Sequence, residues 1–292
     1  MSKIAGVVIA FFPDFNKLIF NIDTYIDHIE QLFIVFNSPV SVDDVNRLQT
    51  KYSKIELIIN KENIGIASAL NQTALKSLNQ GYEWLLTMDQ DSSFQSGDFF
   101  EAFDRSNGIN VSIYCPNSIS SSEINTENTF EAEEVLHVVT SGNLLNLEIW
   151  NRVGGFEEKL FIDEVDNDYC LKAVSAGFKI INFKNIFLVH ELGKNKEISF
   201  LFKKYTIITH PPIRAYYIFR NNLYMFRKYK KKFPEFVRSR KKMLLKVFIE
   251  ILLHSEKRIQ NCQYIAAGIK DYLFDSYGPY KGKLNKNLRD EN

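Results

Sequence analysis

The sequence predicts an α/β fold with a mostly parallel sheet that helices cover on both faces. Short runs rich in β-branched and aromatic residues, typical of buried strands, alternate with segments of helical spacing. The runs cover residues 4–12, 32–36, 55–59, 84–88 and 111–115. Apolar residues between Ile66 and Leu78 predict a helix, with Gly81 as its C-cap. Because ligands of such sheets bind beyond the carboxyl ends of the strands, we expect the site in strand-end loops.

The composition indicates a folded chain whose net charge is too small to produce a strong electrostatic field. Of its 292 residues 45% are apolar and 24% are charged, far from the composition of disordered proteins. This length suits one α/β domain of about 200 residues plus an appendage. The 36 basic and 35 acidic residues leave a net charge of +1, so no overall charge attracts nucleic acid.

Cysteine usage and the N-terminus indicate a cytoplasmic protein. Cys115, Cys170 and Cys262 are odd in number and far apart, which suits reduced thiols better than a disulfide framework. The apolar run at residues 4–12 ends at Pro13 and is too short to span a membrane or to serve as a cleaved leader. We therefore expect neither secretion nor membrane insertion.

The composition changes after about residue 210. Pro211 and Pro212 interrupt regular structure, so we place a boundary there and predict a catalytic domain at 1–210 and a helical, basic and aromatic region at 211–292. The polar stretch 92–134 is predicted to be an irregular connection around one strand. Nine of the sixteen residues at 227–242 are Lys or Arg. This patch predicts either peripheral contact with an anionic membrane or a solvated helix that caps the domain. Nucleic acid binding is not expected, because no reader motif accompanies the patch.

The sequence Asp89-Gln90-Asp91 directly follows the predicted strand at 84–88. Two carboxylates at a strand end supply the hard oxygen ligands that Mg²⁺ or Mn²⁺ shares with substrate phosphates. Acidic pairs in such turns also cap helices, so the motif alone does not decide between the two interpretations.

A second motif, Asn63-Ile64-Gly65-Ile66-Ala67-Ser68-Ala69-Leu70-Asn71, lies at the start of the predicted helix. Small residues and exposed amides at a helix entry suit a bound nucleotide phosphate. The alternative is an ordinary turn begun by Asn63, with the alanine packed on the sheet.

A third motif gathers acidic residues at the start of the helical stretch that ends near Gly177. The residues are Asp163, Glu164, Asp166 and Asp168, among which we expect the general base for an acceptor hydroxyl. Asp166, Cys170 and Ala173 share one helical face, whereas Asp168 projects about 200° away from Asp166. Acidic residues in a first turn are also favoured by the helix dipole, which is the alternative interpretation.

Five elements in this order resemble the family-two glycosyltransferases of the GT-A fold, particularly their rhamnosyltransferase-like branch. They are Asn63-Ile64-Gly65-Ile66-Ala67, Asp89-Gln90-Asp91-Ser92, Ser141-Gly142, Val153-Gly154-Gly155-Phe156, and Leu160-Phe161-Ile162-Asp163 through Cys170-Leu171-Lys172. The resemblance covers roughly residues 4–225. It implies a GT-A domain with a C-terminal helical appendage and an inverting transfer of sugar from a nucleotide-sugar donor.

The resemblance also implies roles for individual residues. Asp89 and Asp91 would bind the metal and the donor, with His190 near them, and Asn63, Gly65 and Ala67 would lie at the nucleotide. Asp166 would deprotonate the acceptor. Asp168 would be structural or contact the acceptor, and Arg220, in the Tyr-Tyr and Arg-Asn element at 214–222, would bind a phosphate-bearing acceptor.

One departure from the family pattern concerns the nucleobase. Relatives carry Asp-Asn at the end of the second strand, whereas this chain has Val35-Phe36-Asn37-Ser38. The acidic contact expected near the nucleobase is therefore missing at Phe36, and the base is not identified. Our first choice of donor is dTDP-rhamnose, with a lipid-linked saccharide of a surface polysaccharide as acceptor. The enzyme would lie in the cytoplasm at the inner face of the cell membrane. The alternatives are an inactive nucleotide-sugar or carbohydrate-binding module and a nucleotidyltransferase.

Overall fold

The computed structural model describes residues 2–106, 108–119, 131–190, 195–200, 203–208 and 211–282. For residues 118, 119, 190, 195–200 and 203–208 it describes the backbone alone. The chain divides into two compact units. Unit 1 comprises Met1–Glu157 and Asp166–Glu191, and unit 2 comprises Glu158–Val165 and Leu192–Asn292.

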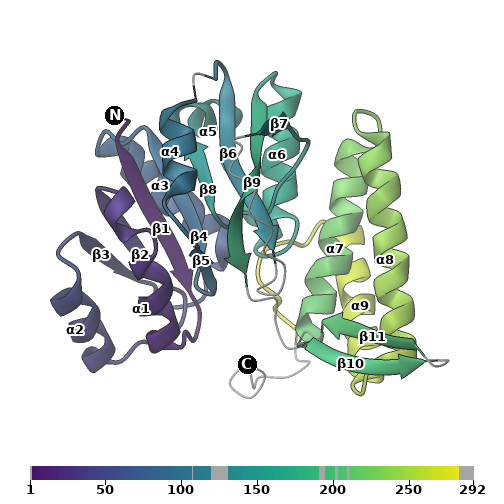
Figure 1. The fold of residues 1–292 in the computed structure, drawn as a ribbon. Helices are drawn as coiled ribbons and strands as arrows, with labels where there is room; N and C mark the ends of the chain where they lie inside the picture. The colour runs from purple at the N-terminus through teal and green to yellow at the C-terminus, as the bar shows by residue number, and fades with distance from the viewer. Residues whose placement is uncertain are drawn as a thin grey trace. The chain divides into compact units, whose positions relative to one another are not determined.

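The centre of unit 1 is a twisted sheet, drawn from purple to green in Figure 1. Its described strands follow the order β3-β2-β1-β4-β8-β6-β9-β5, and β7 pairs with β9. The strands are β1 (Ile4–Ala10), β2 (Gln31–Phe36), β3 (Ile55–Ile59), β4 (Trp84–Asp89), β5 (Ser92–Phe94), β6 (Val111–Ile119), β7 (Ala132–Glu134), β8 (Asn143–Asn146) and β9 (Lys179–His190). The block from β3 to β4 is parallel, and β8 joins it antiparallel to both β4 and β6.

Both faces of β1, β2 and β4 are largely buried, as expected for strands between two helical layers, whereas the edge strand β3 is only partly buried. Alternate residues such as Val8, Ile34 and Leu86 share one apolar cluster with side chains of α1 (Phe15–Asp23) and α4 (Asp98–Asp104). Phe33, on the opposite face of β2, is also fully buried, and Lys76 of α3 (Gly65–Asn79) lies over its ring. The alternation of strands and helices thus produces the covered sheet that the sequence predicts.

Unit 1 has six α-helices in its described part. They are α1 (Phe15–Asp23), α2 (Val42–Lys51), α3 (Gly65–Asn79), α4 (Asp98–Asp104), α5 (Leu147–Val153) and α6 (Val165–Ser175), the last starting at the junction of the units. The predicted C-cap of α3 is confirmed: Gly81 has a φ of +82°, and its N–H donates to Leu78 O.

The polar stretch 92–134 contains more regular structure than we predicted. Its described part forms β5, α4, β6 and β7. The signal for α4 was Phe99, Phe100 and Phe103, whose spacing places all three rings against the sheet, where they are buried. The prediction of an irregular connection was therefore wrong for this helix.

Unit 2 contains a hairpin and three helices in its described part. The antiparallel strands β10 (Asn195–Phe200) and β11 (Lys203–Ile208) precede α7 (Pro212–Tyr229), α8 (Pro234–His254) and α9 (Arg258–Leu273). Aromatic side chains of α7, among them Tyr216 and Tyr217, form its interior with Tyr264 of α9. None of the helices in the described ranges combines the length and apolar character required to cross a bilayer.

The units divide elsewhere than at the predicted boundary after residue 210. The hairpin of residues 195–208 groups with the C-terminal helices, and so does Glu158–Val165. This short segment belongs to unit 2 because side chains of α7 bind its backbone carbonyls, a long-range relationship that local composition does not reveal.

Candidate functional site

The direction in which successive strands are added to the sheet reverses between β1 and β4. The carboxyl ends of these two strands lie at this switch point. From β1 the chain proceeds to β2 and β3, and it then returns to β4 on the other side of β1. Gln90, directly after β4, bonds the backbone of Phe11, directly after β1. Its Oε1 accepts from Phe11 N at 2.8 Å, and its Nε2 donates to Phe11 O at 3.3 Å. The middle residue of Asp89-Gln90-Asp91 therefore ties the two strand ends together.

Asp89 and Asp91 are both half-buried at this edge of the sheet. Asp89 N donates to Ser141 Oγ at 3.0 Å, and Gly142 N donates to Thr87 O at 2.8 Å. The Ser141-Gly142 turn is thus fixed against the end of β4. The side chain of Ser141 is buried, so it serves here to hold the backbone of Asp89.

Two carboxylates in this position suit a hard divalent cation. Mg²⁺ and Mn²⁺ are typically held by one or two protein carboxylates, with substrate phosphates and water completing the shell. In the described part of the chain no group of three or more His, Cys, Asp and Glu side chains could hold a metal. The oxygen donors of Asp89 and Asp91 fit a metal whose other ligands are phosphate oxygens and water.

His190, the third predicted metal residue, is described only by its backbone. It ends β9 and is paired in register with Ser92, the neighbour of Asp91. The backbone thus brings His190 to the strand that follows the two aspartates. Its side chain lies outside the described atoms, so its role as a ligand stays a prediction.

The predicted nucleotide motif lies where β2 and β3 end and α3 begins. Asn37, after β2, accepts from Asn60 Nδ2 at 2.9 Å and donates to Gly65 O at 3.2 Å. Asn63 Oδ1 accepts from Gly65 N at 2.9 Å, and Ala67 is fully buried. These are the contacts of the ordinary-turn interpretation, so nucleotide contact by Asn63, Gly65 and Ala67 stays a prediction.

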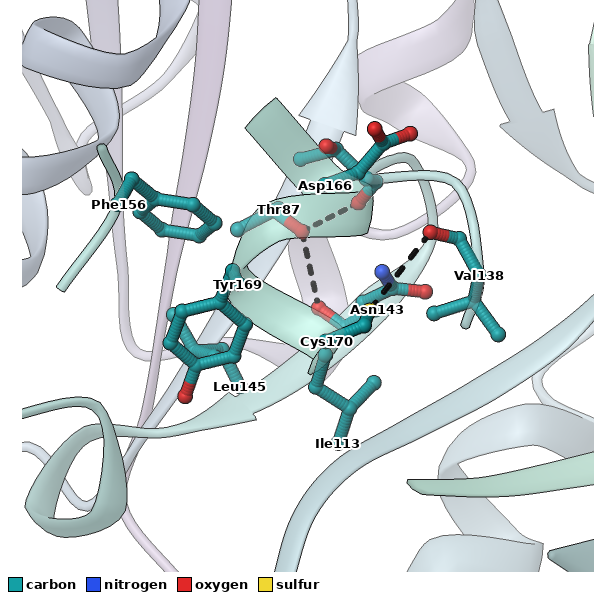
Figure 2. Close-up of a pocket in the computed structure, with 10 residues that line it drawn as sticks. Thr87, Ile113, Val138, Asn143, Leu145, Phe156, Asp166, Tyr169 and Cys170 are labelled. Atoms are coloured by element: carbon teal, nitrogen blue, oxygen red, sulfur yellow. Dashed lines mark hydrogen bonds between the residues drawn. The ribbon is translucent and has the colours of Figure 1, made fainter. Parts of the chain in front are cut away.

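Asp166 lies in the first turn of α6 and is half-buried. It lines a small pocket with Cys170 and with Thr87 of β4, two residues before Asp89, as Figure 2 shows. The other lining residues are Ile113, Val138, Thr140, Asn143, Leu145, Phe156 and Tyr169. The predicted shared face of Asp166 and Cys170 is confirmed by this lining. The Asp166 carboxylate accepts from Asn167 N at 2.8 Å, which keeps it at the helix entry.

The wall of this pocket is fixed by bonds that cross between chain segments. Thr87 Oγ1 donates to Thr140 O at 2.5 Å, and Cys170 Sγ lies 3.9 Å from Val138 O (Figure 2). Burial raises the pKa of Cys170 well above its ordinary value, so its sulfur remains a protonated thiol. Cys170 is therefore part of the pocket wall and not a nucleophile.

Asp168 and Arg220 are both fully buried, which contradicts a direct contact with the acceptor. Asp168 lies behind the face of Asp166, with Lys172 Nζ 3.7 Å from its Oδ2. The guanidinium of Arg220 donates to protein acceptors that include the carbonyls of Lys159 and Leu160. Asp168 thus takes the structural role left open above, and Arg220 binds the protein's own backbone in place of a phosphate.

Sequence reasoning missed three residues that hold this site. They are Gln90 and Ser141, described above, and Asn71 of α3, whose side chain bonds both backbone polar groups of Phe156. Ser141 and Gln90 stand inside the motifs that the sequence singled out, so a signal was present. Asn71 is the last residue of the second motif, but its contact could not be predicted because its partner is 85 residues away.

Comparison with known proteins supports both the fold and the sequence resemblance. The chain is 28% identical over 194 residues to the dTDP-rhamnosyl transferase RfbF of Shigella flexneri, a match that covers 60% of this chain and 64% of that protein. The chain thus matches slightly less than two thirds of the relative's length. No family model matches the chain.

Among solved structures, the chain is similar to GalNAc-T7 crystallised with UDP, GalNAc and Mn²⁺. The TM-score is 0.55 at 9% identity, and the match covers 65% of this chain and 44% of that one. At this identity the likeness concerns the fold alone. Taken together, these similarities show a GT-A glycosyltransferase fold that carries a rhamnosyltransferase-like sequence.

Proposed function

We propose that this protein is an inverting glycosyltransferase, which moves a sugar from a nucleotide-sugar donor to a hydroxyl of a saccharide acceptor. The observation that carries the proposal is the pocket shared by Asp166 and Thr87. Thr87 stands two residues before Asp89 on β4. The proposed base and the proposed diphosphate-binding strand end therefore belong to the same unit.

In this proposal Asp166 acts as the general base. Its half-exposed carboxylate removes the proton of the acceptor hydroxyl while the oxygen attacks the anomeric carbon of the donor. The bond from that carbon to the diphosphate oxygen breaks as the new glycosidic bond forms, so a single displacement inverts the configuration. Asp89 and Asp91 would hold Mg²⁺ or Mn²⁺, which when bound stabilises the charge of the leaving diphosphate.

The donor that we propose first is dTDP-rhamnose. The support is the 28% identity to a relative whose name specifies this donor, together with the sequence motifs. Phe36 takes the place of the acidic residue found in relatives and is fully buried, and its neighbour Asn37 has a buried amide that is bonded to Asn60 and Gly65. A nucleobase contact at this position would then fall to Ser38 or to the backbone.

We also propose that the exposed face of α8 contacts the cytoplasmic face of an anionic membrane, where a lipid-linked acceptor would lie. Arg238, Lys241 and Lys242 are exposed, and the exposed apolar residues Leu245, Ile249 and Leu252 continue the same helical face. Each Lys or Arg close to an anionic leaflet contributes about 1 kcal/mol to the free energy of membrane binding. Sedimentation with phosphatidylserine vesicles should carry the protein down at low salt, and phosphatidylcholine vesicles should not. Equal sedimentation with both lipids would contradict the proposal.

The decisive experiment on activity is the substitution Asp166→Asn with dTDP-rhamnose and Mn²⁺. We expect transfer to fall by at least about a thousandfold, because the amide cannot accept the proton, while the thermal shift produced by the nucleotide is unchanged. The released product should be dTDP. Release of pyrophosphate from a nucleoside triphosphate and a sugar 1-phosphate, supplied in a separate assay, would instead indicate a nucleotidyltransferase. Nucleotide binding without turnover in the wild-type chain would indicate a binding module.

A further inference from the structure

The segment just before Asp166 has an unusual backbone. Phe161, Asp163 and Glu164 have φ values of +67°, +62° and +65°, which place three non-glycine residues in the left-handed region. Such residues are strained and persist only where the surroundings hold them. The segment Glu158–Val165 belongs to unit 2, whereas Asp166 is the first residue of the chain that returns to unit 1.

Two consecutive residues of α7 hold the carbonyls of this segment. Asn221 Nδ2 donates to Leu160 O at 2.9 Å, to Ile162 O at 2.7 Å and to Asp163 O at 3.0 Å. Arg220 donates to Leu160 O at 3.1 Å and to Lys159 O at 3.2 Å. Arg220 Nε also donates to Asn221 Oδ1 at 2.9 Å, so the two side chains orient one another. Both are fully buried.

The acidic side chains of the segment are held from the same unit. Arg214 Nη2 lies 3.0 Å from Asp163 Oδ1. Glu164 is buried, accepts from Asn222 Nδ2 at 3.1 Å and is paired with Arg240 of α8. A buried carboxylate is tolerated only when it is paired and hydrogen-bonded, so these contacts also fix the segment in one arrangement.

We propose that Arg220 and Asn221 are positioning residues for Asp166. They would fix the strained segment whose last residue, Val165, precedes Asp166, and so they would set the direction in which the first turn of α6 presents the carboxylate. This inference rests on the proposed role of Asp166 as the base. It assigns the Arg-Asn element of α7 to catalytic geometry instead of acceptor binding.

The test is the isosteric substitution Asn221→Asp. It keeps the oxygen that accepts from Arg220 Nε but replaces the donor that serves three carbonyls. We expect kcat to fall on the order of 100-fold, as for a base displaced by about 1 Å, with a donor KM changed less than about threefold. Hydrogen–deuterium exchange should rise in peptides covering residues 159–167 and stay unchanged in β1 and β4.

Two further variants complete the design. Asn221→Ser retains one donor, and we expect its kcat to lie between those of the wild type and Asn221→Asp, which keeps the test available if the aspartate variant does not fold. Arg227→Gln is the matched control, since it removes an exposed ion pair of the same helix with Asp275. Its kcat should equal that of the wild type.

The outcomes separate this inference from the proposed function. The positioning role would be overturned if Asn221→Asp or Asn221→Ser had the kcat of the wild type. It would also be overturned if hydrogen–deuterium exchange at residues 159–167 did not change. Failure of the proposed function would be visible earlier, as a wild-type chain that turns over no nucleotide-sugar. A graded fall in kcat with raised exchange at the segment supports the inference.

Discussion

Asn71 binds both polar groups of the Phe156 backbone with the two ends of its side-chain amide. Its Nδ2 donates to Phe156 O at 2.9 Å, and its Oδ1 accepts from Phe156 N at 2.8 Å. Phe156 lines the Asp166 pocket, so α3 fixes one wall of that pocket through this pair. The contact joins the helix of the nucleotide motif to the Gly154-Gly155-Phe156 turn.

Replacing Asn71 by Ala should destabilise the fold by about 2 kcal/mol, because two hydrogen bonds are lost and the backbone groups of Phe156 lose their partner. Chemical denaturation measures the change in the free energy of unfolding. Gln72→Ala, at the exposed neighbouring position, is the matched control and should remain within about 0.5 kcal/mol of the wild type. Equal effects of the two variants would contradict the assignment.

Gly142→Ala should cost about 3 kcal/mol of stability and weaken donor binding. Gly142 has a φ of +80°, and a Cβ there would lie 2.9 Å from Leu188 Cδ2 and 3.1 Å from Pro116 Cγ. The turn would shift, and with it the Ser141 hydroxyl that holds the backbone of Asp89.

Gly81→Ala provides the comparison for that substitution. Gly81 has nearly the same φ, +82°, but nothing lies within 4 Å of an added Cβ. We expect a loss of about 1 kcal/mol from backbone strain alone and unchanged nucleotide binding. If both alanines weakened the nucleotide-induced thermal shift alike, the Ser141-Gly142 turn would have no special relation to the site.

Asp91→Asn and Asp89→Asn should each raise the Mn²⁺ concentration for half-maximal transfer by at least about tenfold, since an amide oxygen carries no charge toward the cation. A metal titration of dTDP release measures this change. Asp98→Asn, at an exposed position on α4, should leave the half-saturating concentration unchanged. Chelation with EDTA should abolish transfer, and added Mn²⁺ should restore it.

The three cysteines should differ strongly in their reactivity toward a maleimide. Burial raises the pKa of Cys115 to about 12 and that of Cys170 still further, so almost no thiolate exists at neutral pH. Cys262 is only partly buried and should label first in the native protein. Mass spectrometry of the labelled peptides checks this order, and all three should react in concentrated guanidinium chloride. Native labelling of Cys170 as fast as Cys262 would show that the pocket wall opens.

The parallel block of the sheet was predictable because its strands are mostly apolar runs. The predicted strand at 55–59 coincides with β3, and that at 84–88 is one residue shorter than β4. The sequence did not predict β8, Asn143–Asn146, because four residues bounded by two asparagines lack a periodic signal. Its position between β4 and β6 depends on pairing with distant strands.

The location of a candidate residue was predictable where it follows from the local sequence. Asp89 ends a buried strand and Asp166 lies in the first turn of a helix; both are half-buried, and their roles stay predictions. The binding partners of Arg220 could not be predicted in this way. A guanidinium that binds a ligand and one that binds carbonyls of its own chain have the same sequence signature, and only the fold brought residues 159 and 160 to it.

The assignment of Glu158–Val165 to unit 2 has a consequence for chimeric enzymes. An exchange of C-terminal regions between relatives with a single junction near residue 192 would separate this octapeptide from the helix that binds it. A graft that carries residues 158–165 together with the C-terminal region requires three crossovers, at 157/158, 165/166 and 191/192, and it should preserve turnover where the simple swap loses it. Two separate stretches of the gene therefore encode unit 2 of this protein.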